Sequence, residues 1–410
     1  MNDKSLIVIG GGAAGFFGAV NAARLNPNLS VTILEKSREV LSKVRVSGGG
    51  RCNVTHHCFD NEVLAKAYPR GGNELRWAFE QFDAQDTVDW FTGRGIQLKT
   101  EEDGRMFPVS NDSATIINCL KDEARKHGVT IRTKTKAESI TPKEDRTFEI
   151  ELRKSTPLVA DFVLVASGGY NRSSAYQWLQ EPGHSIQKPV PSLFTFNFRE
   201  KIFSELAGIS VPKALVAIKD SPFEYTGPLL ITHWGLSGPA VLKTSSWAAR
   251  FLHDQEYRFD IQVNWVYPNN GNEVQSALKK LRADNARKQV NKQNRFATIP
   301  ARLWEKFLAL ASINASRRWA ELSNQDIHKL KQELVNGTYT IQGKTTYKEE
   351  FVTCGGIPLD EVNFGTMESK KVPCLFFAGE VLDIDGITGG YNFQSAWTTG
   401  WIAAQSIANN

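Results

Sequence analysis

A glycine-rich turn near the start of the chain has the spacing of a binding site for phosphate groups. Gly10, Gly12 and Gly15 follow the apolar run 5–10 and precede segment 13–25, where small and apolar residues recur at helical spacing. In such a strand–turn–helix unit, the first glycine permits the tight turn and the second lets the backbone approach a pyrophosphate. The third allows the helix to pack closely on the strand. Because a helix N-terminus favours negative charge, this turn predicts a dinucleotide site.

An acidic residue stands where the ribose of such a dinucleotide would lie. Glu35 follows a second apolar run, 30–34, and stands 25 residues after Gly10. A carboxylate at this place can accept hydrogen bonds from ribose hydroxyls. Its negative charge argues against a 2′-phosphate, and therefore against NADP at this position.

A second glycine run follows from Ser47 to Asn53, with the sequence Ser-Gly-Gly-Gly-Arg-Cys-Asn. It is too rich in glycine for the interior of a helix or strand, and its backbone freedom would let it wrap a ligand closely. Arg51 and Asn53 could donate hydrogen bonds to an anionic or carbonyl-rich ligand, such as the edge of a flavin ring. The alternative is a flexible surface loop without a ligand.

The C-terminal part of the chain holds a third group of site residues. Gly379 and Glu380 end the apolar run 374–380, and the run 385–393 leads into a helix expected at 393–407. The helix N-terminus could stabilise negative charge that develops on a flavin during reduction. Nothing similar occurs between about residues 170 and 350. A long cofactor contacted from both ends of the chain fits FAD better than NAD.

Other reactive residues give weaker signals. Cys52 and Cys58 have five residues between them, not the four of disulfide reductases, and His56 and His57 lie among them. A redox dithiol and a zinc site are both disfavoured, and we expect no metal. In the middle of the chain, the run 231–239 joins a histidine with an aromatic, a hydroxyl and turn residues. Its His233 is a candidate acid or base, and Arg51 is the other candidate catalytic residue.

The hydrophobic pattern assigns these residues to two kinds of region. Helices are expected over 73–93 and 112–127, and strands over 129–134, 136–140, 147–152 and 158–166. Residues 192–264 are expected to be mostly β, residues 272–334 helical, and residues 339–341 and 349–353 strands. The predicted domains are a nucleotide-binding domain of residues 1–190 and 353–410, a β-rich domain of residues 191–268 and 337–352, and a helical domain of residues 269–336.

Composition describes an ordinary globular protein, with 41% hydrophobic and 23% charged residues and a net charge of +5. Residues 273–333 carry 13 Lys or Arg against 6 Asp or Glu, a local excess of +7. This excess indicates a solvated helix face, or else a contact with nucleic acid or an anionic substrate. No apolar run is long enough to span a bilayer, and no signal sequence is recognisable at the start, so we expect a cytoplasmic protein. The oligomeric state is left open.

The chain resembles, over nearly its whole length, the bacterial flavoproteins described as NAD(P)/FAD-dependent oxidoreductases or aminoacetone-oxidase-like FAD-binding proteins. The matching runs are 10–15, 47–53, 104–108, 232–239 and 379–394. A relative in that family is linked to bile-acid dehydroxylation. One departure is His56, where the family pattern has Asn, which could alter the loop beside the flavin ring.

The resemblance implies an α/β fold, with a Rossmann-like FAD-binding domain of the glutathione-reductase type. This domain is interrupted by a β-barrel-like domain in which a helical domain is nested. The resemblance also implies that Glu35 binds the adenosine ribose, that Ala137 lies near the adenine, and that Asp385 and Asn392–Phe393 line the path from pyrophosphate to flavin. The cofactor-binding residues expected in total are Gly10, Gly12, Ala14, Gly15, Glu35, Lys36, Ser47, Gly48, Gly49, Gly50, Arg51, Asn53, Ala137, Ala166, Ser167, Gly168, Gly379, Glu380, Asp385, Gly390, Tyr391, Asn392 and Phe393.

The expected function is that of an FAD-dependent oxidoreductase that transfers a hydride to or from a small organic substrate. No second glycine turn follows a strand, so NADH or NADPH would act as a transient reductant in the substrate cleft, or the substrate itself would reduce the flavin. A flavin-linked tRNA-modifying or RNA-binding protein is a disfavoured alternative. A non-catalytic flavoprotein sensor is another.

Overall fold

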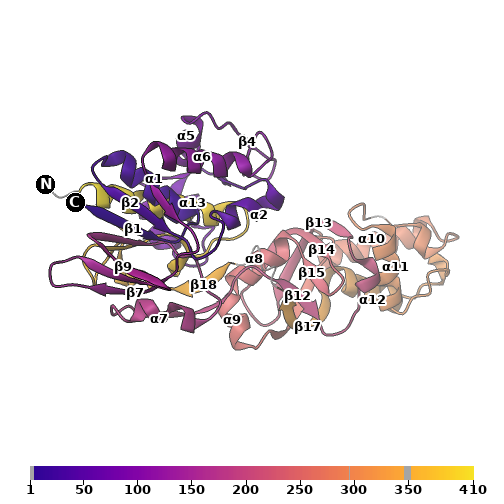
Figure 1. Cartoon of the computed structure of the whole chain (residues 1–410). Helices are drawn as coiled ribbons and strands as arrows, with labels where there is room; N and C mark the ends of the chain where they lie inside the picture. Colours follow the sequence, from indigo (N-terminus) through magenta and orange to yellow (C-terminus); the bar gives the residue numbers. More distant parts are fainter. Residues whose placement is uncertain (1–3, 295, 346–351) are drawn as a thin grey trace. The chain divides into compact units, whose positions relative to one another are not determined.

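The computed structural model describes residues 4–294, 296–345 and 352–410. The chain divides into a first unit of Met1–Ser192 with Tyr347–Asn410 and a second unit of Leu193–Thr346 (Figure 1). Each unit has its own cluster of buried hydrophobic side chains. The first unit is therefore built from both ends of the chain, and the second is a single insertion between them.

A mostly parallel sheet forms the centre of the first unit. Its strand order is β19-β20-β21-β10-β1-β2-β6, and β21, β10, β1, β2 and β6 pair in parallel. The bounds are β1 (Ser5–Ile9), β2 (Ser30–Leu34), β6 (Thr130–Arg132), β10 (Phe162–Val165), β19 (Val362–Asn363), β20 (Glu368–Ser369) and β21 (Leu375–Phe377). Strands β1 and β10 are apolar and buried because both faces of the sheet are covered.

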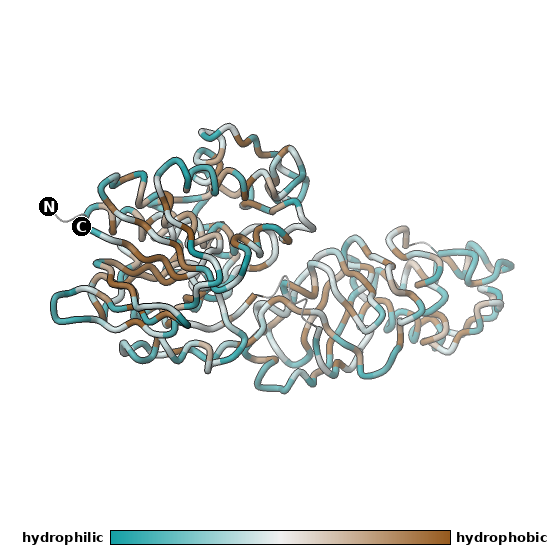
Figure 2. The backbone as a smooth tube through the Cα atoms, in the orientation of Figure 1, coloured by the Kyte–Doolittle hydropathy of each residue, from teal (hydrophilic) through white to brown (hydrophobic). Residues whose placement is uncertain are grey.

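Helices cover one face of this sheet and a second, smaller sheet covers the other (Figure 1). The helices are α1 (Ala13–Leu25), α6 (Ala114–Lys126) and α13 (Tyr391–Ala408). The smaller sheet is the antiparallel meander β7 (Ala137–Pro142), β8 (Phe148–Leu152) and β9 (Ser155–Ala160). The hydrophobic segments of the first unit concentrate in the central sheet (Figure 2).

Helices α1 and α13 join the two ends of the chain at a contact between small residues. A Cβ added at Gly400 would lie 2.8 Å from the backbone oxygen of Ala14, and one added at Gly18 would lie 3.4 Å from the oxygen of Gly400. Only small residues allow helix backbones to approach this closely. At the chain ends, Lys4 Nζ donates to the Asn410 backbone oxygen at 2.6 Å.

Two sequence-based element predictions for the first unit need correction. The helix expected over 73–93 is two helices, because Asp83 caps a new one by accepting hydrogen bonds from the backbone N–H groups of Gln85 and Asp86. The strand expected over 158–166 is two strands, because the chain leaves the meander after β9, which pairs with β8, and enters the central sheet as β10, which pairs with β1. The helices in this region are α2 (Ser42–Gly50), α3 (Asn61–Ala65), α4 (Gly72–Ala78) and α5 (Ala84–Thr92).

Short strands complete the first unit. A three-stranded sheet contains β3 (Thr55–His56), β4 (Leu98–Thr100) and β5 (Arg105–Pro108), and a two-stranded sheet contains β11 (Gln187–Pro191) and β18 (Thr353–Gly356). Helix α7 spans Gln177–Gln180. Ser192 N–H donates to the Val352 backbone oxygen at 2.9 Å, so the chain leaves and re-enters this unit at neighbouring positions. Most of the strand predicted at 349–353 lies outside the described residues.

The second unit is a closed six-stranded barrel with attached helices. The strand order is β12-β15-β14-β13-β16-β17, and β17 pairs with β12 to close the barrel. The strands are β12 (Thr195–Phe198), β13 (Ser210–Ile218), β14 (Glu224–Ile231), β15 (Gly235–Ser237), β16 (Arg258–Asn264) and β17 (Gly337–Thr345). The helices are α8 (Pro239–Trp247), α9 (Ala249–Asp254), α10 (Gly271–Asp284), α11 (Ala301–Leu310) and α12 (Asn324–Asn336).

The prediction that 192–264 is mostly β overlooked α8 and α9. Pro239 at the first helical position starts α8, and its short length gave too little periodicity to identify it. The barrel and the helices of residues 271–336 bury their side chains in one hydrophobic cluster, which contains Trp265, Trp304 and Trp319. The division of this unit at 268 and 337 stays a prediction. Among the described residues, no helix has the length and apolar character needed to cross a membrane.

Candidate functional site

The glycine turn between β1 and α1 has three glycines with different spatial constraints. Gly10 has a φ of +118°, and a Cβ there would lie 2.3 Å from the Ala166 backbone oxygen. A Cβ on Gly15 would lie 2.0 Å from the Gly10 backbone oxygen, so helix and turn approach too closely for any side chain. A Cβ on Gly12 would meet no atom within 4 Å. Two glycines therefore serve packing, and the third leaves the N-terminus of α1 accessible to a ligand.

Glu35 connects this turn to the loop after β2 through hydrogen bonds. Its Oε2 accepts from the Gly11 N–H at 2.8 Å, and its Oε1 accepts from the backbone N–H and hydroxyl of Ser37, at 2.8 and 2.5 Å. Both loops follow the carboxyl ends of parallel strands, where ligands of open α/β sheets bind. The carboxylate is half-buried and oriented beside the glycine turn.

A cavity of about 530 Å³ opens beside Glu35. Its lining includes five of the predicted cofactor-binding residues: Gly10, Glu35, Lys36, Ala137 and Ser167. These come from four separate chain segments that the fold brings together. The lining also includes Tyr170 and Trp178, which the sequence did not indicate because no motif or periodicity marks them. Burial raises the pKa of Tyr170, so its phenol stays neutral beside the ammonium of Lys36, which lies 5.0 Å from the ring centre.

The turn after β10 forms one wall of the site. Ala166 N–H donates to the Ile9 backbone oxygen at 2.9 Å, and Gly168 has a φ of +74°. This contact extends the pairing of β1 with β10 to the point where Gly10 turns away. Residues 166–168 are therefore held directly beside the first glycine turn.

The glycine run 47–53 departs from helical geometry where α2 ends. Ser47 is extended, and Gly48, Gly49 and Gly50 have successive φ values of +58°, +70° and +86°. Such left-handed conformations are readily available only to glycine. A Cβ on Gly48 would press on Phe107 at 2.7 Å, whereas Gly49 and Gly50 would meet no atom within 4 Å. The space beside these two α-carbons is therefore open to a flat ligand, although the Gly50 backbone oxygen already accepts from the Ser113 N–H at 2.9 Å.

Arg51 is held by neighbouring side chains. Its Nη1 donates to Glu101 at 2.5 Å, and its guanidinium carbon lies 4.0 Å from the ring centre of Phe107. Glu101 also pairs with Arg105 at 2.9 Å. Arg105 also pairs with Asp103 at 2.7 Å, so the two guanidinium groups face two carboxylates at this edge of the glycine loop.

Asn53 connects the glycine run to the C-terminal helix. With its amide oriented to satisfy its neighbours, its oxygen accepts from the Gly390 N–H at 2.9 Å and its nitrogen donates to the Thr55 backbone oxygen at 3.0 Å. Close by, Thr55 Oγ1 donates to the Gln394 side chain at 2.6 Å. The amide that we expected to contact the cofactor is therefore used to join segments from opposite ends of the chain.

The C-terminal polar residues are also engaged within the protein. Glu380 accepts from Lys43 at 2.5 Å and from the Thr353 N–H at 2.9 Å. Asn392 closes the loop before α13 with two hydrogen bonds of 2.9 Å to the backbone of Gly386. These side chains hold the protein backbone in position. The groups of the C-terminal segment that remain for a ligand are therefore largely main-chain groups.

Asp385 is fully buried and forms an internal ion pair. Its carboxylate accepts from Arg70 Nε at 2.5 Å, from Arg70 Nη2 and from the Ser192 hydroxyl. Burial raises the pKa of Asp385, while the charge of Arg70 opposes this shift. The resemblance implied that this residue lies on the cofactor path, and the structure shows that its side chain joins the loop at Arg70 to the C-terminal segment.

The other C-terminal candidates pack against aromatic rings. Gly379 has a φ of +74° and approaches α1 so closely that a Cβ would lie 2.8 Å from that of Ala14. Phe393 stacks on Trp397 with ring centres 5.8 Å apart. Tyr391 stacks on His56 at 4.6 Å, and His56 Nδ1 lies 3.0 Å from the Gly389 backbone oxygen. The unusual His56 thus packs against the first residue of the last helix.

The cysteine chemistry considered from the sequence finds little support. Cys52 is buried, and this burial raises its pKa to about 12, so its thiol stays protonated near neutral pH. The pKa of Cys58 is also raised by burial. Within the ranges that the structure describes, no group of three or more His, Cys, Asp or Glu side chains could hold a metal ion.

His233 belongs to the second unit. It lies exposed in the turn between β14 and β15, next to Trp234, which is 62% exposed. Lys201 Nζ lies 5.4 Å from the ring centre of Trp234. Among the predicted site residues, His233 is contributed by the inserted unit and the others by the first unit.

These features fit an FAD molecule in chemical terms. The free N–H groups at the start of α1 suit a pyrophosphate, and the Glu35 cavity has the size of a small-molecule site. The left-handed glycines Gly49 and Gly50 leave room for a flat ring beside the backbone. Residues from both ends of the chain contribute, as the length of FAD requires.

Comparisons with known proteins agree with this geometry. The family model of the HI0933-like protein Rossmann domain matches residues 4–406. The 3-dehydro-bile acid delta(4,6)-reductase of Clostridium scindens is 28% identical over 409 residues, which cover 98% of each chain. The ribosomal RNA dihydrouridine synthase of Escherichia coli is 30% identical over 413 residues, covering 98% of this chain and 97% of that protein.

Among solved structures, the 3-ketosteroid delta1-dehydrogenase of Sterolibacterium denitrificans is similar in fold, with a TM-score of 0.54 at 14% identity and full coverage of both chains. The predicted fold class, an α/β Rossmann-like FAD-binding domain with an inserted barrel, is confirmed.

Proposed function

Because the chain belongs to the HI0933-like family of FAD-binding oxidoreductases, we propose that it reduces a carbon–carbon double bond conjugated with a carbonyl group. The observation that carries this proposal is the similarity, over 98% of the chain, to a 3-dehydro-bile acid delta(4,6)-reductase and to a ribosomal RNA dihydrouridine synthase. The delta(4,6) bonds of a 3-dehydro steroid are conjugated with its ketone. The double bond that is lost when uridine becomes dihydrouridine is conjugated with a carbonyl of the base. Reduction of a double bond directly conjugated with a carbonyl group needs a hydride at the remote carbon and a proton at the carbon beside the carbonyl.

The protein residues that would hold the cofactor come from both ends of the chain. Glu35 would accept hydrogen bonds from the ribose, the start of α1 would bind the pyrophosphate, and the open space at Gly49 and Gly50 would receive the ring. FAD, when bound, supplies the hydride chemistry. The helix N-terminus at Gly390, fixed by Asn53, favours negative charge near it.

Arg51 is the residue best suited to act on the substrate carbonyl. Hydride addition to a conjugated double bond places negative charge on the carbonyl oxygen, and a guanidinium stabilises such charge. The pair with Glu101 and the contact with Phe107 would hold this cation in one orientation. His233 is the second candidate, as a proton donor to the carbon beside the carbonyl.

The electron donor in this proposal is NADH or NADPH, bound transiently. The test is anaerobic addition of each nicotinamide to the FAD-loaded protein while the visible flavin band is recorded. Bleaching by one nicotinamide supports a reductase. A band that stays oxidised with both would overturn the nicotinamide part of the proposal and favour a substrate that itself reduces the flavin, or a non-catalytic flavoprotein sensor.

The substrate class is tested by reoxidation. A 3-oxo-4-ene steroid added to the reduced protein should restore the flavin band and gain two hydrogens, measured by mass spectrometry. The matched control is the corresponding saturated 3-oxo steroid, which should leave the band bleached. Equal reoxidation by both compounds would contradict the proposal, since the double bond would then play no part.

RNA is the second candidate substrate, and a specific observation favours it. Residues 273–333 carry 13 Lys or Arg against 6 Asp or Glu, and they contribute α10, α11 and α12 to the second unit. Basic helical surfaces bind phosphate backbones. Incubation with unmodified ribosomal RNA and NADPH, followed by mass spectrometry of the nucleosides, would detect dihydrouridine. Absence of dihydrouridine alongside steroid reduction would exclude this candidate in favour of the first.

A further inference from the structure

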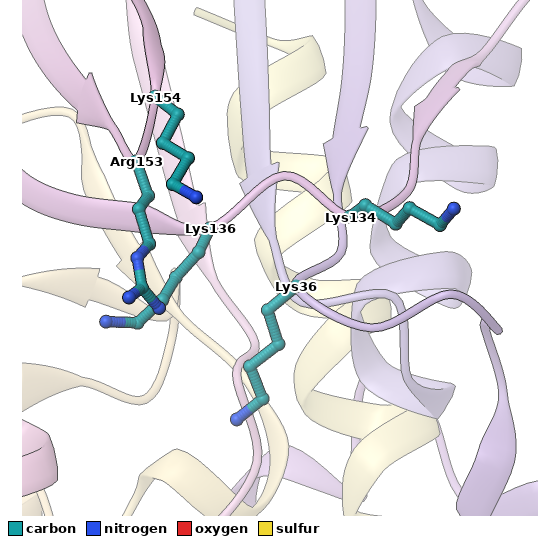
Figure 3. Close-up of a pocket in the computed structure, with 5 residues that line it drawn as sticks. All are labelled: Lys36, Lys134, Lys136, Arg153 and Lys154. Carbon is teal, nitrogen blue, oxygen red and sulfur yellow. The ribbon is translucent and has the colours of Figure 1, made fainter.

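A second cavity in the first unit is lined only by cationic side chains. Its volume is about 490 Å³, and its lining residues are Lys36, Lys134, Lys136, Arg153 and Lys154, called here the cationic pocket. Figure 3 shows Lys36, Lys136, Arg153 and Lys154 around a common space, with Lys134 extending from the adjacent loop. Lys36 and Lys136 also line the cavity beside Glu35, so the two cavities are neighbours.

Few acidic groups balance these charges. Lys136 Nζ pairs with Glu138 at 3.0 Å, and Arg153 Nε lies 4.0 Å from the same carboxylate. Lys36, Lys134 and Lys154 have no ion-pair partner within the part of the chain that the structure describes. Like charges gathered around one cavity repel each other, and this repulsion raises the free energy of the unliganded protein. An anion bound in the pocket would remove it.

Backbone turns bring these exposed cations to the pocket. Arg153 and Lys154 form the two-residue turn between β8 and β9, flanked by the pair Leu152–Ser155. Lys154 and Lys134 have left-handed φ values of +65° and +54°. Glycine or asparagine suits such positions better than lysine. The turns therefore hold lysine where the backbone alone would favour another residue.

We propose that the cationic pocket binds closely spaced phosphate groups, as found in an RNA backbone or in a free oligophosphate chain. Lysine is a common phosphate ligand, and arginine donates two parallel hydrogen bonds to phosphate oxygens. The lining has no aromatic residue, so the pocket recognises phosphates and not a base. This site goes beyond the proposed function, because phosphate binding here is independent of which double bond is reduced.

The test compares two double variants that each remove two positive charges from a turn of the same three-stranded sheet. Arg153→Gln with Lys154→Gln alters the pocket, and Lys143→Gln with Arg146→Gln alters the turn between β7 and β8. Lys143 and Arg146 are exposed and do not line the pocket, and Arg146 has a similar φ of +68°. Fluorescence anisotropy of a labelled single-stranded RNA, with inorganic tripolyphosphate as competitor, measures binding to the FAD-loaded full chain.

We expect the pocket variant to bind the RNA or the tripolyphosphate about tenfold more weakly at low salt. For RNA, the slope of log affinity against log salt concentration should become shallower by about 0.7 for each lost phosphate contact. The control variant should stay within about twofold of the unmodified protein, because its charges lie outside the pocket. RNA binding much tighter than that of tripolyphosphate would identify an extended backbone as the ligand, and similar affinities would identify a free oligophosphate.

Two results would overturn the proposal: no binding of either probe, or equal weakening by both double variants. The visible flavin band and circular dichroism would confirm that each variant is folded and loaded. Steroid reduction is measured separately, so its failure with intact phosphate binding would contradict the proposed function alone. Normal reduction with no phosphate binding would contradict only the phosphate site.

Discussion

At the scale of single residues, the glycines of the first turn have different roles, some in folding and one in ligand binding. Gly15 is required because its Cβ would collide with the Gly10 backbone oxygen, whereas Gly12 faces no atom of the protein. The same residue type thus serves two purposes at positions three residues apart. This distinction can be measured because one substitution should affect stability and the other ligand affinity.

We predict that Gly12→Ala keeps the free energy of unfolding within about 0.5 kcal/mol but weakens FAD binding at least about tenfold. The added methyl group would occupy the space through which the pyrophosphate approaches the backbone. Gly15→Ala should lower the free energy of unfolding by about 1–3 kcal/mol, since α1 must move away from the turn. Urea unfolding of the apoprotein and FAD titration measure the two effects. Equal stability losses in both variants would contradict the assignment of Gly12 to ligand binding and of Gly15 to packing.

The cysteines offer a second prediction at this scale. Cys52, Cys119 and Cys354 are buried, and Cys58 and Cys374 are partly exposed. Because burial raises the pKa of Cys52 to about 12, its thiolate is scarce at about pH 8. A thiol reagent should therefore modify at most two cysteines in the folded protein and all five after denaturation. Mapping of the modified sites by mass spectrometry checks this result. Rapid labelling of Cys52 would contradict it and would support the hypothesis of a redox dithiol.

At the scale of elements, buried polar side chains connect segments that are distant in sequence. Asn53 joins the glycine run to the start of α13, and Asp385 joins the C-terminal segment to Arg70. Both were expected at the cofactor because their positions match site motifs. The structure shows both side chains bonded to a neighbouring segment, and sequence spacing alone cannot reveal such a contact.

We predict that Asn53→Ala lowers the free energy of unfolding by about 1–3 kcal/mol, because the partly buried Gly390 N–H loses the acceptor that the buried Asn53 amide provides. FAD affinity should fall as well, since the start of α13 loses its fixed position. The control is Asn28→Ala, at an exposed position far from both glycine runs in sequence. Calorimetry with and without FAD measures both effects. Unchanged stability in the Asn53 variant would show that this amide does not join the two segments.

Glu361 provides a pH-dependent connection between elements. Its carboxylate accepts from Lys371 Nζ at 2.7 Å and from the Ser185 backbone N–H at 3.1 Å. Burial alone would raise the pKa of Glu361, but Lys371 and Ser185 lower it below the ordinary value of 4.5. The folded state therefore holds this carboxylate deprotonated more strongly than the unfolded state does. Its stabilising contribution is present above about pH 4.5 and is lost as the pH falls through the lowered pKa.

We accordingly expect Glu361→Gln to lower the free energy of unfolding by roughly 1–3 kcal/mol at neutral pH, with a smaller difference in acid. Urea unfolding at a series of pH values measures this change. Glu39→Gln is the control, because Glu39 is exposed and its pair with Arg45 is long, at 3.9 Å. The ionic contribution would be contradicted if the difference in free energy of unfolding between Glu361→Gln and the unmodified protein did not change with pH.

At the scale of the whole molecule, the chain contains two separate cores. The ends of the second unit lie close together, since Thr195 pairs with Thr345 at the closure of the barrel. The ends that it leaves in the first unit are also neighbours, since Ser192 bonds to Val352. Each unit thus has the boundary geometry of a domain that folds by itself.

We predict that residues 193–346, expressed alone, unfold cooperatively and bind no FAD. The first unit, with the insertion replaced by a short glycine–serine linker, should retain FAD binding, because every predicted site residue except His233 lies in it. Circular dichroism and flavin absorbance test both fragments. An unfolded fragment 193–346 beside a folded full chain would show that its core depends on the first unit.

The amino-acid sequence by itself determined the nucleotide-binding turn, the cofactor class and the split domain. These features follow from local backbone requirements, such as the need for glycines after an apolar strand. Residues only a few positions apart in the sequence satisfy such requirements. Only the tertiary structure decided which side chains remain available to a ligand. Asn53 and Asp385 are engaged within the protein, and the cationic pocket gathers lysines from three loops. Such outcomes depend on contacts between segments that no short-range pattern connects, because the partners meet only when the sheet assembles.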